Sequence, residues 1–331
     1  MLAIYRRIAA AYNTVILPSV LTLSLRYILS VTLYKEDTEA FFKHSISISM
    51  ILSKDNDFET TKRKRIEYMP KKAVDSTEAT KSSIYEMMVN SIDYYNKASG
   101  TVIYGDGDFI NHATVITFQT DMTTGSAYCN QRYYEHIDNI YSVTTEDLDE
   151  NYIIQDIETY YDDGIYLKLD HDYKKYFKNI GDPVTPQLEK RVADAEIYSI
   201  GTDGLPRAVY RADYTRVPLA SRCLFPQGFT MGALHDFSLW NIEEITELDG
   251  NECFRITGTP EESYAGKTRI HNYEMYVNTK NGCIMKLQGF NENGELVFYV
   301  YTDDLRFDDE AEEHKKAPSE IPEEYRKIGE T

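Results

Sequence analysis

The sequence predicts a mostly β protein of the α+β class, in which an antiparallel sheet is accompanied by a few helices. Tyrosine is abundant, with 28 residues among 331, whereas glycine (17) and proline (10) are few, and aromatic residues favour strands. In several apolar runs the apolar side chains fall on both faces, so the sheet must be covered on both sides. Dipeptides typical of tight β-turns recur at Asp163-Gly164, Asp203-Gly204, Asp249-Gly250, Asn281-Gly282 and Asn293-Gly294.

The charge of the chain separates its first 75 residues from the rest. Lys plus Arg number 35 and Asp plus Glu number 54, which gives a formal net charge of −19. Residues 1–75 hold 12 basic and 8 acidic side chains, a net +4, and the remaining 256 hold 23 and 46, a net −23. Because an acidic body repels phosphate backbones, nucleic acid is excluded as its partner.

Residues 1–35 are predicted to be a membrane anchor or a signal segment. Residues 14–33 form a mostly apolar run, long enough to cross a bilayer as a helix, with one internal charge at Arg26. Arg6 and Arg7 precede the run and favour an amino terminus inside the cell. Three interpretations stay open. The segment is an uncleaved anchor that holds the body outside the cytoplasm at the cell membrane, a cleaved signal of a secreted protein, or a buried helix.

Charge and composition divide the rest of the chain into three parts. Residues 36–79 mix charges and contain the basic runs Lys62–Arg65 and Lys71-Lys72. This pattern predicts a charged, solvated spacer, with binding to anionic lipid head groups or a localisation signal as the alternatives. Residues 80–308 are predicted to be the folded body. Residues 309–331 are acidic and hold two prolines, so we expect this tail to be disordered.

The body is predicted to open with an amphipathic helix over residues 83–98. Ser83 and Glu86 have the spacing of a capping box, and Gly100 follows as a residue that ends the helix. Between them apolar side chains recur at helical spacing, at Ile84, Met87, Met88, Ile92 and Tyr95. A second, shorter helix is expected over residues 185–195, with Pro186 in its first turn.

Most of the remaining body is predicted to be β-strand. Runs rich in β-branched and aromatic residues occupy 102–104, 113–120, 126–134, 152–161, 165–169, 252–258, 270–277, 283–290 and 295–307. The last four follow one another with turn dipeptides between most of them, which predicts an antiparallel meander.

Two strands of this meander need cover on both faces. In residues 283–290 and 296–305 apolar side chains stand at odd and even positions alike. The helix predicted at 83–98 can cover one face. The other face is covered by a second sheet, or it is the inside of a curved sheet that holds an apolar ligand. A plain two-layer core without a ligand is the third possibility.

The carboxyl-terminal half resembles a known family. Residues 253–259, CFRITGT, resemble a Y-x-I-x-G strand. Residues 277–286, VNTKNGCIMK, resemble the V-D-x-x-T-G-x-I-x-K hairpin of bacterial periplasmic lipoprotein carriers (LolA) and of sigma-factor regulators (RseB). The helix followed by Gly100-Thr101-Val102 and a last strand ending at Asp303-Asp304-Leu305 are also similar to that family. The resemblance covers residues 80–308 and is one of turns and strands, not of catalytic residues.

This resemblance implies an unclosed antiparallel β-barrel, a strongly curved sheet with helices on its concave, apolar side. It further implies a non-enzymatic protein outside the cytoplasm. Such a protein binds an acyl chain or a lipoprotein, or it senses the cell envelope for a sigma-factor system with a membrane-bound regulatory protein. The chain departs from the carriers in its predicted anchor and in lacking an arginine that matches the carriers' ligand-handling position. Both departures favour an anchored lipid- or envelope-sensing relative. The alternative is a protein-interaction scaffold with a filled core and no small-molecule ligand.

The residues expected to line the concave side alternate along neighbouring strands. A flexible methionine and flat aromatic rings suit a slot for alkyl chains of varied shape. Within each strand, residues two apart share a face, and one tryptophan is expected near them. The predicted lining is Trp240, Phe254, Ile256, Tyr273, Met275, Val277, Phe298 and Val300.

Common catalytic and metal-binding motifs are missing from the sequence. G-x-S-x-G, H-E-x-x-H, a Walker loop and G-x-G-x-x-G do not occur, and no two of the seven histidines are four residues apart. The four cysteines form no C-x-x-C pair, which argues against a zinc or dithiol site, although their even number permits disulfides outside the cytoplasm. They are Cys129, Cys223, Cys253 and Cys283. The sequence thus predicts no catalytic residue, no metal and no cofactor.

Overall fold

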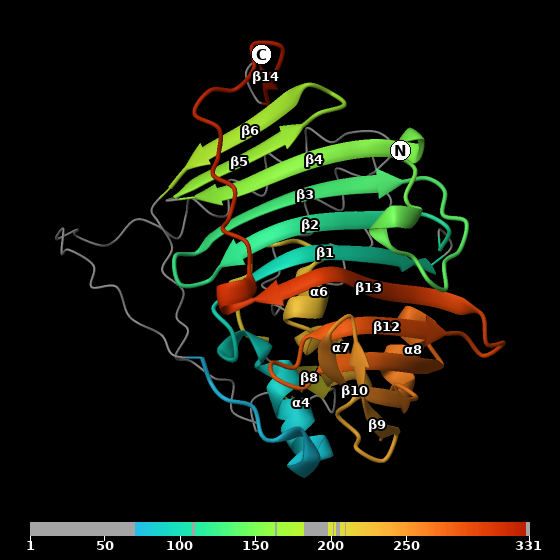
Figure 1. Cartoon of the computed structure of the whole chain (residues 1–331). Helices are drawn as coiled ribbons and strands as arrows, with labels where there is room; N and C mark the ends of the chain where they lie inside the picture. Colours follow the sequence, from blue (N-terminus) through green and yellow to red (C-terminus); the bar gives the residue numbers. More distant parts are fainter. Residues whose placement is uncertain are drawn as a thin grey trace. The chain divides into compact units, whose positions relative to one another are not determined.

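A sheet of twelve strands dominates the part of the chain that the structure describes (Figure 1). In this computed structural model the described residues are 70–107, 110–162, 164–181, 198–200, 202, 206–208 and 210–328. The strands of the sheet are β1 Lys97–Asp106, β2 Ala113–Asp121, β3 Ser126–Tyr134, β4 Ile153–Asp162, β5 Ile165–Asp170, β6 Lys175–Ile180, β9 Trp240–Leu248, β10 Asn251–Gly258, β11 Asn272–Asn278, β12 Ile284–Phe290, β13 Leu296–Phe307 and β14 Arg326–Lys327. Two short strands form a separate pair, β7 Tyr198–Ile200 and β8 Pro206–Ala208.

The helices of the described residues are short. The α-helices are α4 Lys81–Val89, α6 Ser221–Leu224, α7 Gln227–Ala233 and α8 Glu262–Thr268. Single 3₁₀ turns add η1 Ser76–Glu78, η2 Ser91–Asp93, η4 Thr145–Asp147, η5 Glu150–Tyr152 and η6 Asp308–Glu310.

The sheet is strongly curved and does not close into a barrel. Its strand order is β14-β6-β5-β4-β3-β2-β1-β13-β12-β11-β10-β9, so β14 and β9 form its edges. In the middle β1 pairs with β13, with Val102 opposite Thr302, and this pairing joins the first and last strands of the body. Neighbouring strands are antiparallel except β14 and β6. The predicted fold, a mostly β, unclosed antiparallel barrel with a few helices on its concave side, is confirmed.

The predicted meander is present as β10 to β13, with β9 added in front of it. Its hairpin turns carry the predicted glycines in the left-handed region, Gly250 at φ 75°, Gly282 at φ 74° and Gly294 at φ 78°. Because L-residues rarely adopt this conformation, the turn dipeptides fix where one strand ends and the next begins. Helix α8 lies between β10 and β11.

The first helix is shorter than predicted and begins earlier. Helix α4 ends at Val89, and its capping box joins Thr80 to Ser83 instead of Ser83 to Glu86. A strand begins at Lys97, and Gly100 lies inside that strand rather than after a helix. At Gly100 φ is +147°, and an added Cβ would stand 2.9 Å from the Leu305 Cα. The glycine therefore serves the close approach of β1 and β13, which a helix-ending role would not require.

Separate apolar layers cover the two faces of the sheet. The main cluster lies between the concave face and helices α4, α6 and α7. On the other face, residues of β1, β2 and β13 pack against Ile137, Val143 and Leu148 from the segment between β3 and β4. The two-sided apolar pattern of the strands is explained by these covers, since each face has its own.

The carboxyl-terminal tail differs from the expected disorder. Residues 309–328 are described, and in Figure 1 the red segment runs from η6 across the strands to β14. Lys315 forms an ion pair with Glu158 at 2.7 Å, and Ala317, Ile321 and Tyr325 pack against the third apolar cluster, on β3 to β6. The acidic composition predicted disorder, whereas these three spaced apolar side chains give the tail a surface to bury.

Several predictions fall on residues outside those described: the anchor or signal segment 1–35, most of the spacer 36–79, and the helix at 185–195. Within the described residues, no helix has both the length and the apolar character needed to span a bilayer.

Candidate functional site

The structure gathers the predicted lining residues in one place. Seven of the eight belong to the main apolar cluster and are at most 2% exposed, and Phe298 is partly buried and packs against the same cluster. The strand register explains the gathering, because Ile256 lies opposite Met275, Met275 opposite Leu287, and Leu287 opposite Val300. These four side chains form a row across β10, β11, β12 and β13. That the row holds a ligand stays a prediction.

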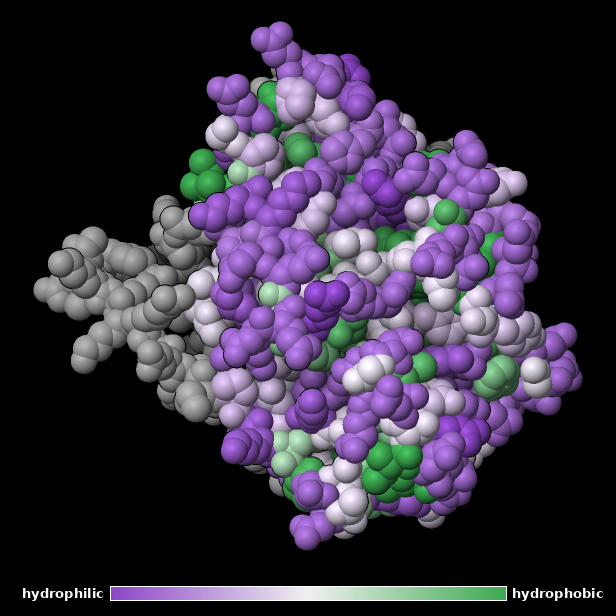
Figure 2. Space-filling view, viewed as in Figure 1, coloured by the Kyte–Doolittle hydropathy of each residue, from purple (hydrophilic) through white to green (hydrophobic). Residues whose placement is uncertain are grey.

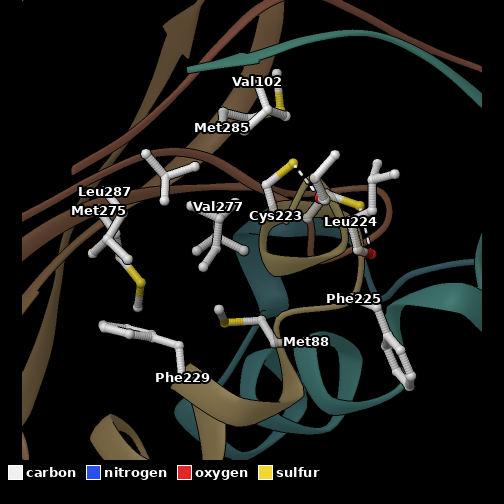
Figure 3. Packing of buried hydrophobic residues seen from close by; sticks show 14 of the residues in the cluster. Met88, Val102, Cys223, Leu224, Phe225, Phe229, Met275, Val277, Met285 and Leu287 are labelled. Atoms are coloured by element: carbon white, nitrogen blue, oxygen red, sulfur yellow. Dashed lines mark hydrogen bonds between the residues drawn. The ribbon is translucent and has the colours of Figure 1, made fainter. Parts of the chain in front are cut away.

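Short helices close the concave side over this row. In Figure 3, Met88 of α4 and Phe229 of α7 lie beside Met275 and Val277 of the sheet. Leu224, the last residue of α6, is also fully buried in this cluster. Phe229 and Leu224 were not predicted, because α6 and α7 span four and seven residues and show no helical periodicity.

Side chains from the sheet and from the segment after α4 hold the ends of the short helices. Tyr95 donates a hydrogen bond to the Leu224 carbonyl at 2.9 Å, at the end of α6. At the end of α7, Tyr273 donates to the Ala233 carbonyl at 3.0 Å and the Trp240 indole to the Leu234 carbonyl at 3.0 Å. Two of the predicted lining residues thus also satisfy carbonyls that a helix end leaves without partners. Burial raises the pKa of Tyr273, so its hydroxyl stays a donor at neutral pH.

A buried polar network ties α7 to η2. Asp93 accepts from Arg211 Nη2 at 2.9 Å and from Lys71 Nζ at 2.6 Å. Arg211 Nη1 donates to Asn90 at 2.9 Å, and Gln227 of α7 accepts from the Arg211 backbone N–H and donates to its carbonyl. Asp93 is fully buried and Arg211 nearly so. The network therefore fixes the chain that enters α6 and α7.

The four cysteines are free, buried thiols in this structure. Burial raises the pKa of Cys129 to about 11 and that of Cys253 to about 12, and it raises the pKa values of Cys223 and Cys283 further. Such thiols are poor nucleophiles and poor metal ligands. Across the residues described, no three His, Cys, Asp or Glu side chains stand together as a metal site would require.

A cavity lies beside Tyr104, where β1 and β3 end and β2 begins. Its volume is about 230 Å³, and its lining includes Tyr104, His112, Thr114 and Tyr133. Tyr104 packs edge-to-face against Phe298, with ring centroids 5.5 Å apart. Tyr104 thus lies between the cavity and Phe298, the one predicted lining residue that is only partly buried.

Comparisons with known proteins find similarity among solved structures alone, since no family model and no curated protein matches the chain. One similar structure is the MucA/MucB complex of Pseudomonas aeruginosa, at 12% identity and TM-score 0.31, covering 67% of this chain and 56% of that chain. Another is LprF from Mycobacterium bovis, at 9% identity and TM-score 0.32, covering 74% and 98%. A third is a LolA superfamily protein from Nitrosomonas europaea, at 10% identity and TM-score 0.20, covering 70% and 94%.

The structure from Nitrosomonas europaea is of the superfamily that residues 253–259 and 277–286 of this chain resemble. This chain spans little more than half the length of the Pseudomonas chain that it matches. Because all three TM-scores lie below 0.5, we draw no conclusion about function from these similarities.

Proposed function

We propose that this protein is a non-enzymatic binding protein that takes up an acyl chain, free or on a lipoprotein, on the concave side of its sheet. Its amino-terminal segment tethers it to the cell membrane with the body outside the cytoplasm, where it senses the envelope for a sigma-factor system together with a membrane-bound regulatory protein. The observation that carries the proposal is the apolar row Ile256, Met275, Leu287 and Val300, covered by helices as short as α6 and α7.

The cover is of a kind that can open. Helices of four and seven residues are not stable by themselves in water, so α6 and α7 depend on packing against the sheet. Since Leu224 and Phe229 of these helices are buried in the main cluster, opening exposes apolar surface that an incoming alkyl chain must cover again. Methionines at 88, 231, 275 and 285 in the cluster can repack around an alkyl chain.

A closed concave side is the expected state without a ligand. Each Å² of apolar surface left in water costs roughly 25 cal/mol, so an empty trough would collapse onto its helices. An alkyl chain that replaces the helices buries the same surface again. The exposure of at most 2% for seven lining residues is therefore compatible with binding.

The experiment compares two valine substitutions with a fluorescent fatty acid as the probe. Val300→Phe fills the row on the concave side, and Val115→Phe makes the same change in the cluster on the other face. Both overpack a core and should cost about 1–3 kcal/mol. Energy transfer from Trp240, the single tryptophan, reports probe binding.

We expect the wild type to bind the probe and Val300→Phe to weaken binding about ten-fold, with Val115→Phe within about two-fold of the wild type. Equal effects of the two substitutions would place the probe elsewhere and refute the proposed site. Urea unfolding of both variants checks that their folded fractions are equal.

A second candidate function is a protein-interaction scaffold with a filled core. The low exposure of the lining favours it, because seven of the eight predicted lining residues are at most 2% exposed. A wild type that unfolds cooperatively but binds no fatty acid probe would decide for this second function.

A further inference from the structure

Arg222 stands where the main apolar cluster meets solvent. It is an exposed residue of α6, and its guanidinium lies over the Tyr104 ring, 4.6 Å from the ring centroid. Its Nη1 also donates a hydrogen bond to the Tyr104 hydroxyl. Tyr104 in turn packs against Phe298, the partly buried lining residue. Arg222 is thus one aromatic ring away from the predicted lining.

Arg222 forms no ion pair with any carboxylate of the described residues. Four other arginines of the same body do so: Arg132 with Asp156, Arg211 with Asp93, Arg255 with Glu274, and Arg306 with Asp304. In a segment whose net charge is −23, carboxylates for such pairing are plentiful. A guanidinium held on a tyrosine face instead keeps donors directed to solvent, where they can receive an anion.

The cavity beside Tyr104 adds polar groups to this arginine. Polar residues line it: Thr114 of β2, Tyr133 of β3 and His112. Its volume of about 230 Å³ suits a compact polar group. One carboxylate, that of Asp106, also lines it and accepts a hydrogen bond from the Tyr104 hydroxyl. The same hydroxyl therefore links Asp106 to Arg222, so their charges partly offset each other.

We propose that Arg222 and the cavity beside Tyr104 bind the anionic head group, a carboxylate or a phosphate, of an amphiphile whose alkyl chain passes Phe298 into the main cluster. This inference rests on the proposed function and names the class of ligand: an acidic amphiphile rather than a neutral one. The arginine selects for the charge of the head group, and the apolar row accepts the chain.

The test uses two probes with the same fluorescent chain, a fatty acid and its methyl ester. We expect the wild type to bind the acid about five- to ten-fold more tightly than the ester at low salt, and less so at 1 M salt, because ions screen exposed charges. Arg222→Gln should remove the preference and leave ester binding unchanged, whereas Arg222→Lys should keep part of it. Arg306→Gln is the matched control, because Arg306 is an exposed arginine of β13 that pairs with Asp304. This variant should behave as the wild type.

Two further measurements are needed. One tells an amphiphile from a free anion, and the other tests the effect of the Asp106 carboxylate. Decyl phosphate should compete with the acid probe at concentrations where inorganic phosphate does not. Competition by inorganic phosphate and not by decyl phosphate would refute the proposal that the ligand is an amphiphile. Asp106→Asn should tighten the acid probe about two- to three-fold by removing a like charge. Equal wild-type affinity for acid and ester would refute this inference and leave the proposed function standing. Failure of both probes to bind would refute the two together.

Discussion

Replacing Asp93 by asparagine removes the only carboxylate that the described residues place against the buried Arg211 guanidinium. The shape of the side chain is kept, so packing changes little. Arg211 retains its hydrogen bond to Asn90, but a buried cation then lacks its counter-charge. Lys71 loses the same partner, although its side chain is 34% exposed and water can solvate it.

The size of the effect follows from burial. Leaving one member of a buried ion pair without its partner costs about 3–5 kcal/mol. Because the Lys71 side chain is partly exposed, the loss of its pair with Asp93 adds less, on the order of 1 kcal/mol. Asp304→Asn is the matched control, since Asp304 pairs with Arg306 at the surface and has φ 52°, a conformation that asparagine tolerates. It should cost less than about 0.5 kcal/mol.

Urea unfolding followed by Trp240 fluorescence measures both variants. With a slope of about 3 kcal/mol per M, the midpoint for Asp93→Asn should fall by about 1–1.7 M, and that for Asp304→Asn by less than about 0.2 M. The double variant Asp93→Asn/Arg211→Met should recover much of the loss, because it leaves no unpaired charge. A midpoint shift for Asp93→Asn as small as that of its control would refute the role assigned to the network.

Two more outcomes are expected. Burial alone would raise the pKa of Glu158, but hydrogen bonds from Lys315 and Tyr128 outweigh it and lower the pKa. The ion pair with Lys315 therefore stabilises the docked tail above pH ~4.3 and is lost as the pH falls through the lowered value. The protection of the β14 amides, relative to exchange from an unfolded chain at the same pH, should therefore fall at low pH in the wild type but change less in Lys315→Met. The buried thiols should resist iodoacetamide at pH 8 in the native protein and react in urea; rapid native labelling of Cys129 would contradict its raised pKa.

The strands of the sheet could be predicted because their signals are local. Turn dipeptides that need a positive φ, such as Asn281-Gly282, fix the ends of strands without knowledge of the rest of the fold. Strand β9 was not predicted, because its local pattern is polar. As an edge strand it carries exposed Glu243, Glu244 and Glu247, which read as a polar segment and protect the edge from pairing with other chains.

The candidate site was predictable on its sheet side and not on its helix side. Period-two alternation places Met275 and Val277 on one face, and the strand register then brings them to Val300. The cover is decided by long-range packing. Phe229 and Leu224 belong to helices too short to show a pattern, and Arg211 reaches Asp93 across 118 positions of sequence. No local rule of spacing reports such contacts.

These contacts also decide which part of the core can open. The sheet side of the row is held by strand pairing on both sides of β11 and β12, so it stays fixed. The helix side is held by the Arg211 network and by three hydrogen bonds to helix ends, each worth about 0.5–1.5 kcal/mol. An alkyl chain that enters the cluster must offset these terms, whereas Asp93→Asn removes the largest of them beforehand. Under the proposed function, we therefore expect Asp93→Asn both to lower stability and to speed the association of the acyl probe.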